Sequence, residues 1–259
     1  MRPKGREHCA MNPSIPSPTS SSPTSSSTST STLPSSPSSP SAPPSSPSSP
    51  RRSPQVRDGA RRFRWTPADI AVAAALGVAC GMVFWGFNFA YQAISPILGA
   101  ILPGIASVLH AFWYFSGPLA LLIIRKPGAA LFVNLVGTFA EMLLGNQFSF
   151  GFVIVSALLQ GVFAEIPFAI ARYRRYSLPL TMAAGALTAL EYGVYLMFFV
   201  YQGVALLSPR GVIHMISELV GGILFAGVMS WFLFLAIART GALDRFASGR
   251  AVRRAVEQS

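Results

Sequence analysis

Residues 69–91 read DIAVAAALGVACGMVFWGFNFAY, an apolar run whose one acidic side chain, Asp69, stands at its start. A helix needs roughly 20 predominantly apolar residues to cross the hydrocarbon layer of a membrane, which is about 30 Å thick. The run is long enough for one crossing, and it therefore predicts a transmembrane helix.

Small residues give this predicted helix two distinct faces. Alanines recur every four residues along one face, at Ala71, Ala75 and Ala79. The roughly opposite face holds Gly77, Gly81, Trp85, Asn88 and Gln92. Because small side chains allow helices to approach closely, the alanine ridge is a candidate docking surface for another membrane protein, and ordinary packing inside a bundle is the competing interpretation. The face that carries Trp85 is a candidate wall of an internal cavity.

Five more apolar runs follow the first, separated by Pro, Gly, Asn or Arg clusters. They cover Ala100–Ile124, Ala129–Leu144, Phe150–Ala171, Leu180–Tyr201 and Val212–Ala238. We therefore expect an all-α integral membrane protein with a bundle of about six transmembrane helices. The third run is short, and Pro103 and Pro118 in the second predict a kink or an interfacial start.

The chain divides into three parts by composition. Pro13–Pro54 is almost entirely Ser, Pro and Thr, so it cannot bury enough apolar surface to offset the entropy lost on ordering. We predict a disordered, basic cytoplasmic tail at 1–65, a six-helix substrate-binding domain at 66–240, and a second basic cytoplasmic tail at 241–259. The proline density of the first tail disfavours an organelle transit peptide, which would form an amphipathic helix.

The net charge of +11 reflects topology rather than nucleic-acid binding. Every Lys and Arg except Arg210 lies in one of four places: the N-terminal tail, the Arg125–Lys126 turn, the turn of Arg172, Arg174 and Arg175, and the C-terminal segment that begins at Arg239. With six crossings, the positive-inside rule places both termini and both turns in the cytoplasm. We expect a multi-pass protein of a bacterial cell membrane, surrounded by lipid.

Four glutamates fall inside predicted spans, at Glu141, Glu165, Glu191 and Glu218. Ionisable groups in hydrocarbon are costly, so they usually face a cavity or a partner. For any one of them, a protonated side chain hydrogen-bonded for packing is the competing interpretation. Helical spacing puts three of the four on polar faces, and the orientation of Glu165 stays open.

Aromatic residues accompany these acids. Tyr192 shares a face with Glu191, and His110, Trp113 and Tyr114 form a further aromatic face in the second span. No Lys or Arg lies within any span. A cavity lined by these groups would accept hydrogen bonds and would favour a cation or an amine donor.

The usual signatures of catalysis and of nucleotide or metal binding are missing from the sequence. It has no phosphate-binding loop, no Gly-x-Ser-x-Gly elbow, no His-Glu-x-x-His motif and no Cys-x-x-Cys pair. We therefore expect no enzyme activity, no cofactor and no metal. His214 and Glu218 stand one helical turn apart, and we expect them to form a hydrogen-bonded pair. An intramembrane enzyme that uses them with a metal is the less favoured hypothesis.

Six stretches of the sequence together resemble a known family. They are GMVFWGFNFAY at 81–91, Trp113 through Gly117-Pro118, IIRKPGAA at 123–130, EMLLGNQ at 141–147, LQGVFAE at 159–165 and ARYRRY at 171–176. This set is similar to the YkoE-type substrate-binding (S) components of energy-coupling factor transporters, which are associated with thiamine or its hydroxymethylpyrimidine precursor. About 170 residues carry the resemblance, and the Ser/Pro tail lies outside it.

The resemblance implies a six-helix vitamin-binding subunit that docks on a transmembrane coupling subunit powered by two cytoplasmic ATPases. Ala71, Ala75 and Ala79 resemble the docking motif on the first helix of such proteins. Residue type and helical face select the predicted substrate contacts, which are Trp85, Asn88, Trp113, Glu141, Glu165, Glu191, Tyr192 and Glu218. The alternative is a stand-alone transporter that couples proton or sodium movement to a small cationic substrate.

Overall fold

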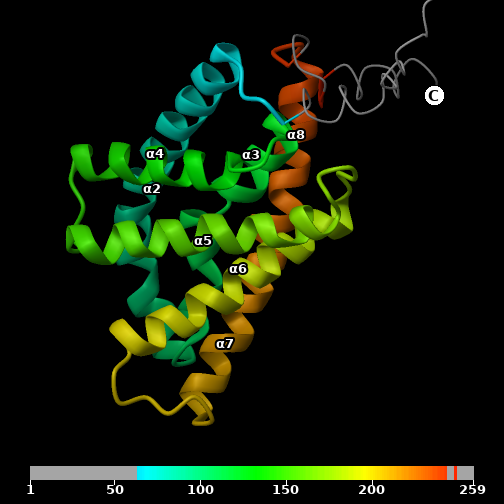
Figure 1. The fold of residues 1–259 in the computed structure, drawn as a ribbon. Coiled ribbons are helices and arrows are strands. Elements are labelled where there is room, and N and C mark those ends of the chain that lie inside the picture. The colour runs from blue at the N-terminus through cyan, green and yellow to red at the C-terminus, as the bar shows by residue number, and fades with distance from the viewer. Residues whose placement is uncertain (1–62, 244–247, 250–259) are drawn as a thin grey trace, which may run out of the picture. The chain divides into compact units, whose positions relative to one another are not determined.

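The computed structural model describes residues 63–243 and 248–249, and the described part contains helices and no strand (Figure 1). In chain order the elements are α2 (Pro67–Ile101), the 3-10 helix η1 (Ile105–Trp113), α3 (Ser116–Ile124), α4 (Ala129–Leu144), α5 (Phe150–Ile170), α6 (Leu178–Phe199), α7 (Pro209–Gly221), the π-helix η2 (Gly222–Met229) and α8 (Ser230–Arg239). Nearly all of the two predicted tails lies outside the described residues, so their disorder stays a prediction.

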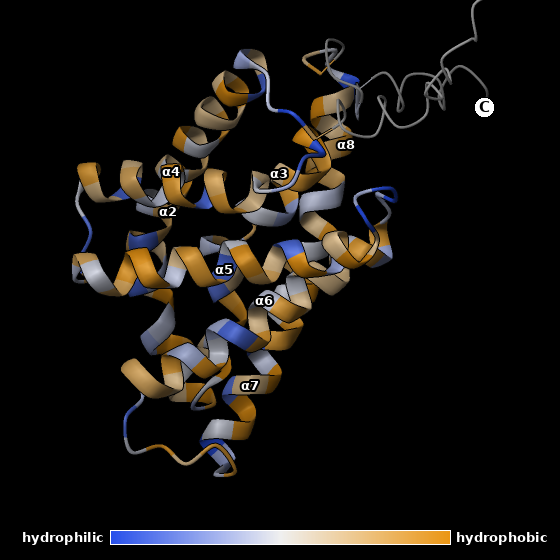
Figure 2. Cartoon of the chain, in the orientation of Figure 1, coloured by the Kyte–Doolittle hydropathy of each residue, from blue (hydrophilic) through white to orange (hydrophobic). Residues whose placement is uncertain are grey.

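These elements form six apolar passages, which confirms the predicted class of fold. Five are long and apolar enough to cross a membrane, with η1 and α3 forming one passage and α7, η2 and α8 another. The sixth, α4, is shorter, as expected for the third run. Apolar residues cover most of the helices, and hydrophilic ones gather in the connections (Figure 2). The cytoplasmic placement of the termini stays a prediction.

The first helix is longer than predicted at both ends. It begins at Pro67 behind a capping box in which Asp69 Oδ2 accepts from the Thr66 backbone N–H at 2.7 Å, and Lys126 pairs with Asp69. The predicted end at Tyr91 is wrong, because the helix continues through Pro96 to Ile101. A proline removes one backbone donor, and the apolar residues beyond Pro96 allow the helix to resume.

The second passage begins with the irregularity that its prolines predict. Pro103 and Gly104 form the turn, with Gly104 at a φ of 101°, and helical structure starts at Ile105 rather than Ala100. The first half is a 3-10 helix, which has three residues per turn. Pro118 lies in the first turn of α3, where its missing N–H would have no helical partner.

Glycines bring the first helix close to α4. A Cβ added at Gly81 would lie 2.4 Å from the Gly137 carbonyl oxygen, and one at Gly77 would lie 2.7 Å from the Val136 side chain. These glycines therefore form the helix contact inside the bundle. The expectation that they line a cavity is wrong, and it is Asn88, further along the same face, that reaches a polar site.

Candidate functional site

Three side chains from three elements form one hydrogen-bonded chain. The Trp113 indole Nε1 donates to Asn88 Oδ1 at 3.1 Å, and Asn88 Nδ2 donates to Glu141 Oε1 at 2.7 Å. Glu141 is 3% exposed, and a buried carboxylate is costly unless it is hydrogen-bonded. The Asn88 amide supplies one such bond and fixes the orientation of the carboxylate.

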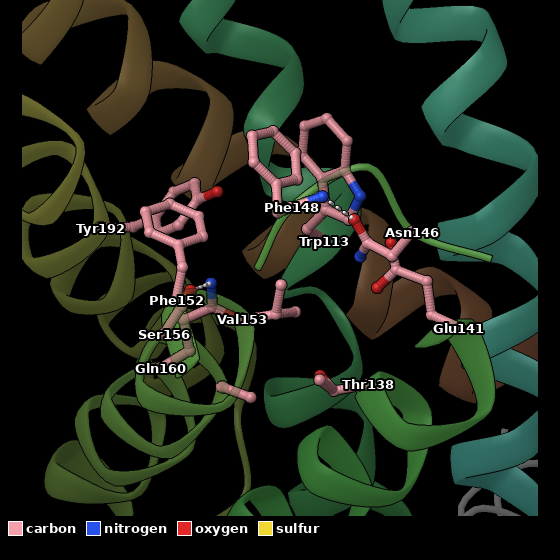
Figure 3. Close-up of a pocket in the computed structure, with 11 residues that line it drawn as sticks. Trp113, Thr138, Glu141, Asn146, Phe148, Phe152, Val153, Ser156, Gln160 and Tyr192 are labelled. Carbon is pink, nitrogen blue, oxygen red and sulfur yellow. Dashed lines mark hydrogen bonds between the residues drawn. The ribbon is translucent and has the colours of Figure 1, made fainter. Parts of the chain in front are cut away.

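A cavity of about 30 Å³ borders this chain (Figure 3). Its lining comes from η1, α4, the α4–α5 connection, α5 and α6, and consists of Trp113, Thr138, Glu141, Asn146, Phe148, Phe152, Val153, Ser156, Ala157, Gln160 and Tyr192. Oxygen acceptors and aromatic rings alternate around it, and no Lys or Arg is among these residues. The lining therefore suits a flat ligand that donates hydrogen bonds or carries positive charge.

In this conformation the cavity is small. Ligand sites usually enclose about 300–1,000 Å³, whereas this space is about 30 Å³, near the size of a water molecule. The connection between α4 and α5 covers it through Asn146 and Phe148. The Phe148 ring stacks on Phe152 with centroids 5.4 Å apart, and the Phe148 backbone N–H donates to Asn146 Oδ1 at 2.9 Å.

The 3-10 geometry of η1 explains how one short segment reaches three polar partners. Residues three apart lie in line on such a helix, which aligns Ser107, His110 and Trp113. Trp113 contacts Asn88, while the other two reach α7. Ser107 Oγ lies 2.5 Å from His214 Nδ1, and His110 Nδ1 lies 2.6 Å from Glu218 Oε2.

Glu218 is fully buried, and both of its oxygens have partners. Besides the bond from His110, the Tyr114 hydroxyl donates to Oε1 at 2.9 Å. On the other side of the ring, His110 Nε2 lies 2.8 Å from the Tyr91 hydroxyl oxygen, within hydrogen-bond distance. This arrangement clamps η1 to α7 and leaves Glu218 little capacity for a ligand.

The expected pair of His214 and Glu218 is wrong. His214 uses Nε2 for the Gly193 carbonyl at 3.1 Å and Nδ1 for Ser107, so His110 takes its place beside Glu218. Spacing along α7 shows that His214 and Glu218 share a face. On the neighbouring helix η1, however, Ser107 bonds to His214 and His110 bonds to Glu218, so the two residues have different partners. The described residues contain no group of three His, Cys, Asp or Glu placed to hold a metal ion.

Comparisons with known proteins point to one family. A family model described as the permease component of an ABC-type cobalt transport system matches residues 68–191. A Bacillus subtilis (strain 168) protein that bears the name HMP/thiamine permease protein YkoE is 29% identical over 191 residues, which is 73% of this chain and 93% of that protein. A crystal structure described as an S-component of an ECF transporter matches with a TM-score of 0.66 at 27% identity, over 76% of this chain and 99% of the other. The chain is therefore similar to the S components of energy-coupling factor transporters over about three quarters of its length.

The resemblance inferred from the sequence is thereby confirmed. This chain is a multi-pass protein of the cell membrane, and its relatives are transport proteins rather than enzymes, which supports a role without catalysis. The residues that contact the ligand stay a prediction, for which the structure supplies positions.

Glu191 differs from Glu141, Glu165 and Glu218 because its carboxylate is unpaired within the described residues. Both of its oxygens are buried and have no hydrogen-bond partner among the described residues. The neighbouring Tyr192 lines the cavity, and its ring centroid lies 5.7 Å from that of His110 and 5.6 Å from that of Tyr114. The polar face of α6 therefore meets both the cavity and the Glu218 clamp.

Two predicted contacts lie elsewhere. Glu165 accepts from the Ala130 backbone N–H at 3.0 Å and from the Tyr173 hydroxyl at 2.5 Å, so it caps the start of α4. Trp85 packs edge-on against Phe89, with centroids 5.1 Å apart, and lines no part of the cavity beside Glu141. We leave both out of the proposed binding site.

The alanine ridge on α2 is exposed. Ala71, Ala75 and Ala79 all have exposed side chains, whereas the glycines on the opposite face are buried. Packing inside the bundle, the competing interpretation of the ridge, is therefore excluded. The ridge is free to contact lipid or another protein.

Several residues that line the cavity were not predicted from the sequence. Ser156 and Gln160 stand one turn apart on α5, and Gln160 Nε2 donates to Ser156 Oγ at 2.8 Å. Their i, i+4 spacing in an apolar helix was a usable signal. Asn146 and Phe148 lie in a short connection, where no helical periodicity reveals which side chains point inward.

Proposed function

We propose that this chain is the membrane-embedded capture subunit of an ECF-type importer, and that it binds thiamine or its hydroxymethylpyrimidine precursor. The observation that carries the proposal is the buried Glu141 carboxylate, held by Asn88 beside an aromatic cavity whose lining has no basic residue. The name of the Bacillus subtilis relative supports the same class of ligand.

The ligand chemistry fits this lining. An aminopyrimidine presents N–H donors, for which Glu141 and the Gln160 amide oxygen are acceptors. The thiazolium of thiamine carries a permanent positive charge, and aromatic rings attract a desolvated cation by about 2 kcal/mol. Trp113, Phe148 and Tyr192 supply such rings. We assign Asn88 and Glu218 positioning roles, and Glu191 the role of a further hydrogen-bond acceptor near the site.

Binding requires that this small cavity enlarge. We expect the α4–α5 connection to move on binding, because Gly145 at its start adopts a φ of 111° and Phe148 is 41% exposed. Displacing Asn146 and Phe148 would open the space between Trp113 and Glu141 without disturbing the helices. A bound vitamin would then replace Phe148 against the Trp113 side of the cavity.

The exposed alanine ridge is the proposed contact with a transmembrane coupling subunit, which separate cytoplasmic ATPases would power. Small side chains let a partner helix approach the backbone of α2. Uptake assays test the whole proposal: cells or liposomes that contain this chain with a coupling subunit and two ATPases should accumulate labelled thiamine only when ATP is hydrolysed. Uptake that needs neither the partners nor ATP would contradict it.

A stand-alone proton- or sodium-coupled transporter is the second candidate. It is supported by Glu191, whose buried carboxylate has no partner in the described chain and could be neutralised by a proton or a sodium ion. The purified chain alone in liposomes separates the two candidates. Gradient-driven flux of substrate would favour this one, and tight binding without flux would rule it out.

A further inference from the structure

A second and larger cavity lies on the other side of Tyr91 and Trp113. It encloses about 430 Å³ between the end of α2, the start of η1, the end of α6 and the start of α7. Its polar lining includes Tyr91, Ser107, Tyr201, Arg210 and His214. This volume lies within the usual range of small-molecule sites.

Arg210 is the unusual member of this lining. It is the one basic residue that the four basic clusters do not include, and the positive-inside rule gives no reason for it. Its guanidinium lies over the Tyr201 ring, 5.5 Å from the centroid. Within the described residues no carboxylate forms an ion pair with it. The charge of Arg210 is therefore available to a ligand in the cavity.

The other polar groups of this cavity do not offset that charge. Both His214 nitrogens are occupied, by Ser107 and by the Gly193 carbonyl, so neither is free to bind a ligand in the cavity. No Asp or Glu is among the lining residues. The second cavity thus presents a guanidinium and hydroxyl groups, which are the donors that proteins use to hold phosphate.

The two cavities have opposite electrostatic character and share an aromatic wall. The Tyr91 ring faces the second cavity, Trp113 lines the first, and their centroids are 5.0 Å apart. One side offers the Glu141 carboxylate, and the other offers the Arg210 guanidinium. A ligand with a cationic or amine-bearing ring at one end and an anion at the other would match both sides.

We propose that the second cavity is a phosphate subsite, so that the protein binds the phosphate monoester of the captured vitamin with Arg210 as the counter-ion. This inference rests on the proposed function, since the ring of the same ligand occupies the cavity beside Glu141. An arginine in this position would repel a purely cationic ligand, whereas it attracts a phosphorylated one. Arg210 is then a specificity-determining residue.

The test is titration calorimetry with thiamine and thiamine monophosphate on the wild type, Arg210→Gln and the matched control Arg239→Gln, which changes an exposed arginine at the end of α8. We expect Arg210→Gln to weaken monophosphate binding at least about tenfold and thiamine binding less than about twofold. The control should change neither. Thiamine binding also verifies that each variant is folded.

The outcomes separate this inference from the proposed function. Equal affinity of Arg210→Gln and wild type for the monophosphate, with thiamine still bound, would overturn the phosphate subsite alone. If monophosphate binding depends on Arg210 but thiamine does not bind, the result would support an anion site at Arg210 and would count against the proposed vitamin capture. Binding of neither compound would overturn both.

Discussion

Asn88 on α2 donates its side-chain amide to Glu141 on α4 at 2.7 Å, so two helices that meet through glycines also share a buried polar contact. The contact orients the Glu141 carboxylate at the edge of the aromatic cavity. Close helix packing and the candidate binding site are thus parts of one interface.

Replacing Glu141 by Gln should weaken vitamin binding by at least about tenfold, because a hydrogen bond to a charged group contributes about 1.5–3 kcal/mol. The substitution keeps the shape of the side chain and the oxygen that accepts from Asn88. Calorimetry measures the change. Glu165→Gln is the matched control, since Glu165 caps α4 away from the cavity, and its affinity should stay within about twofold of wild type. Equal losses in both variants would refute a direct role for Glu141.

Glu218→Gln should reduce stability more than affinity. The buried carboxylate holds His110 and Tyr114, and breaking one partner of such an arrangement costs about 3–5 kcal/mol. Thermal unfolding in detergent should show a lower midpoint, and His110→Ala combined with Glu218→Gln should cost less than the sum of the single changes. A variant as stable as wild type with lost affinity would instead make Glu218 a ligand contact.

Gly81→Ala should disrupt the bundle, because the added Cβ would lie 2.4 Å from the Gly137 carbonyl oxygen. Overpacking of this kind costs about 1–3 kcal/mol or more. Gly86→Ala provides the control on the same helix, since nothing lies within 4 Å of a Cβ at that position. The yield of monodisperse protein and its thermal midpoint report the difference. Indistinguishable behaviour of the two variants would contradict the close contact of α2 and α4.

Ala75→Leu should impair assembly with a coupling subunit while vitamin binding persists. The larger side chain would hold the partner helix away from the exposed ridge. Ala183→Leu is the control, because Ala183 is an exposed alanine on α6. Copurification of the coupling subunit should fall for the first variant and not for the second. Normal assembly of Ala75→Leu would remove the ridge from the proposed interface.

The sequence predicted the passages well because the cost of burying backbone and charge in lipid leaves a strong pattern. The short third passage and the irregular start of the second do not depend on knowing the neighbours of each helix, whereas the sequence left open whether Ala71, Ala75 and Ala79 pack inside the bundle. The end of α2 was missed because Pro96 is a weaker stop in a long apolar helix than it is in water.

The candidate site was predicted only in part. Periodicity identifies residues that share a face, as for Glu141 and Glu218, but it does not identify the helix opposite. The partner of Glu218 is His110, which depends on the 3-10 geometry of η1. The orientation of Glu165 stayed open for a similar reason, since its partners Ala130 and Tyr173 lie at the start of α4 and beyond α5.

We propose that this chain alone captures a vitamin. Calorimetric titration of the purified wild-type protein with thiamine and with hydroxymethylpyrimidine tests this capture. We expect a dissociation constant of about 1 μM or less for at least one of the two compounds, with a stoichiometry of about one ligand per chain. The absence of binding by both compounds, from protein that remains folded and monodisperse, would contradict it.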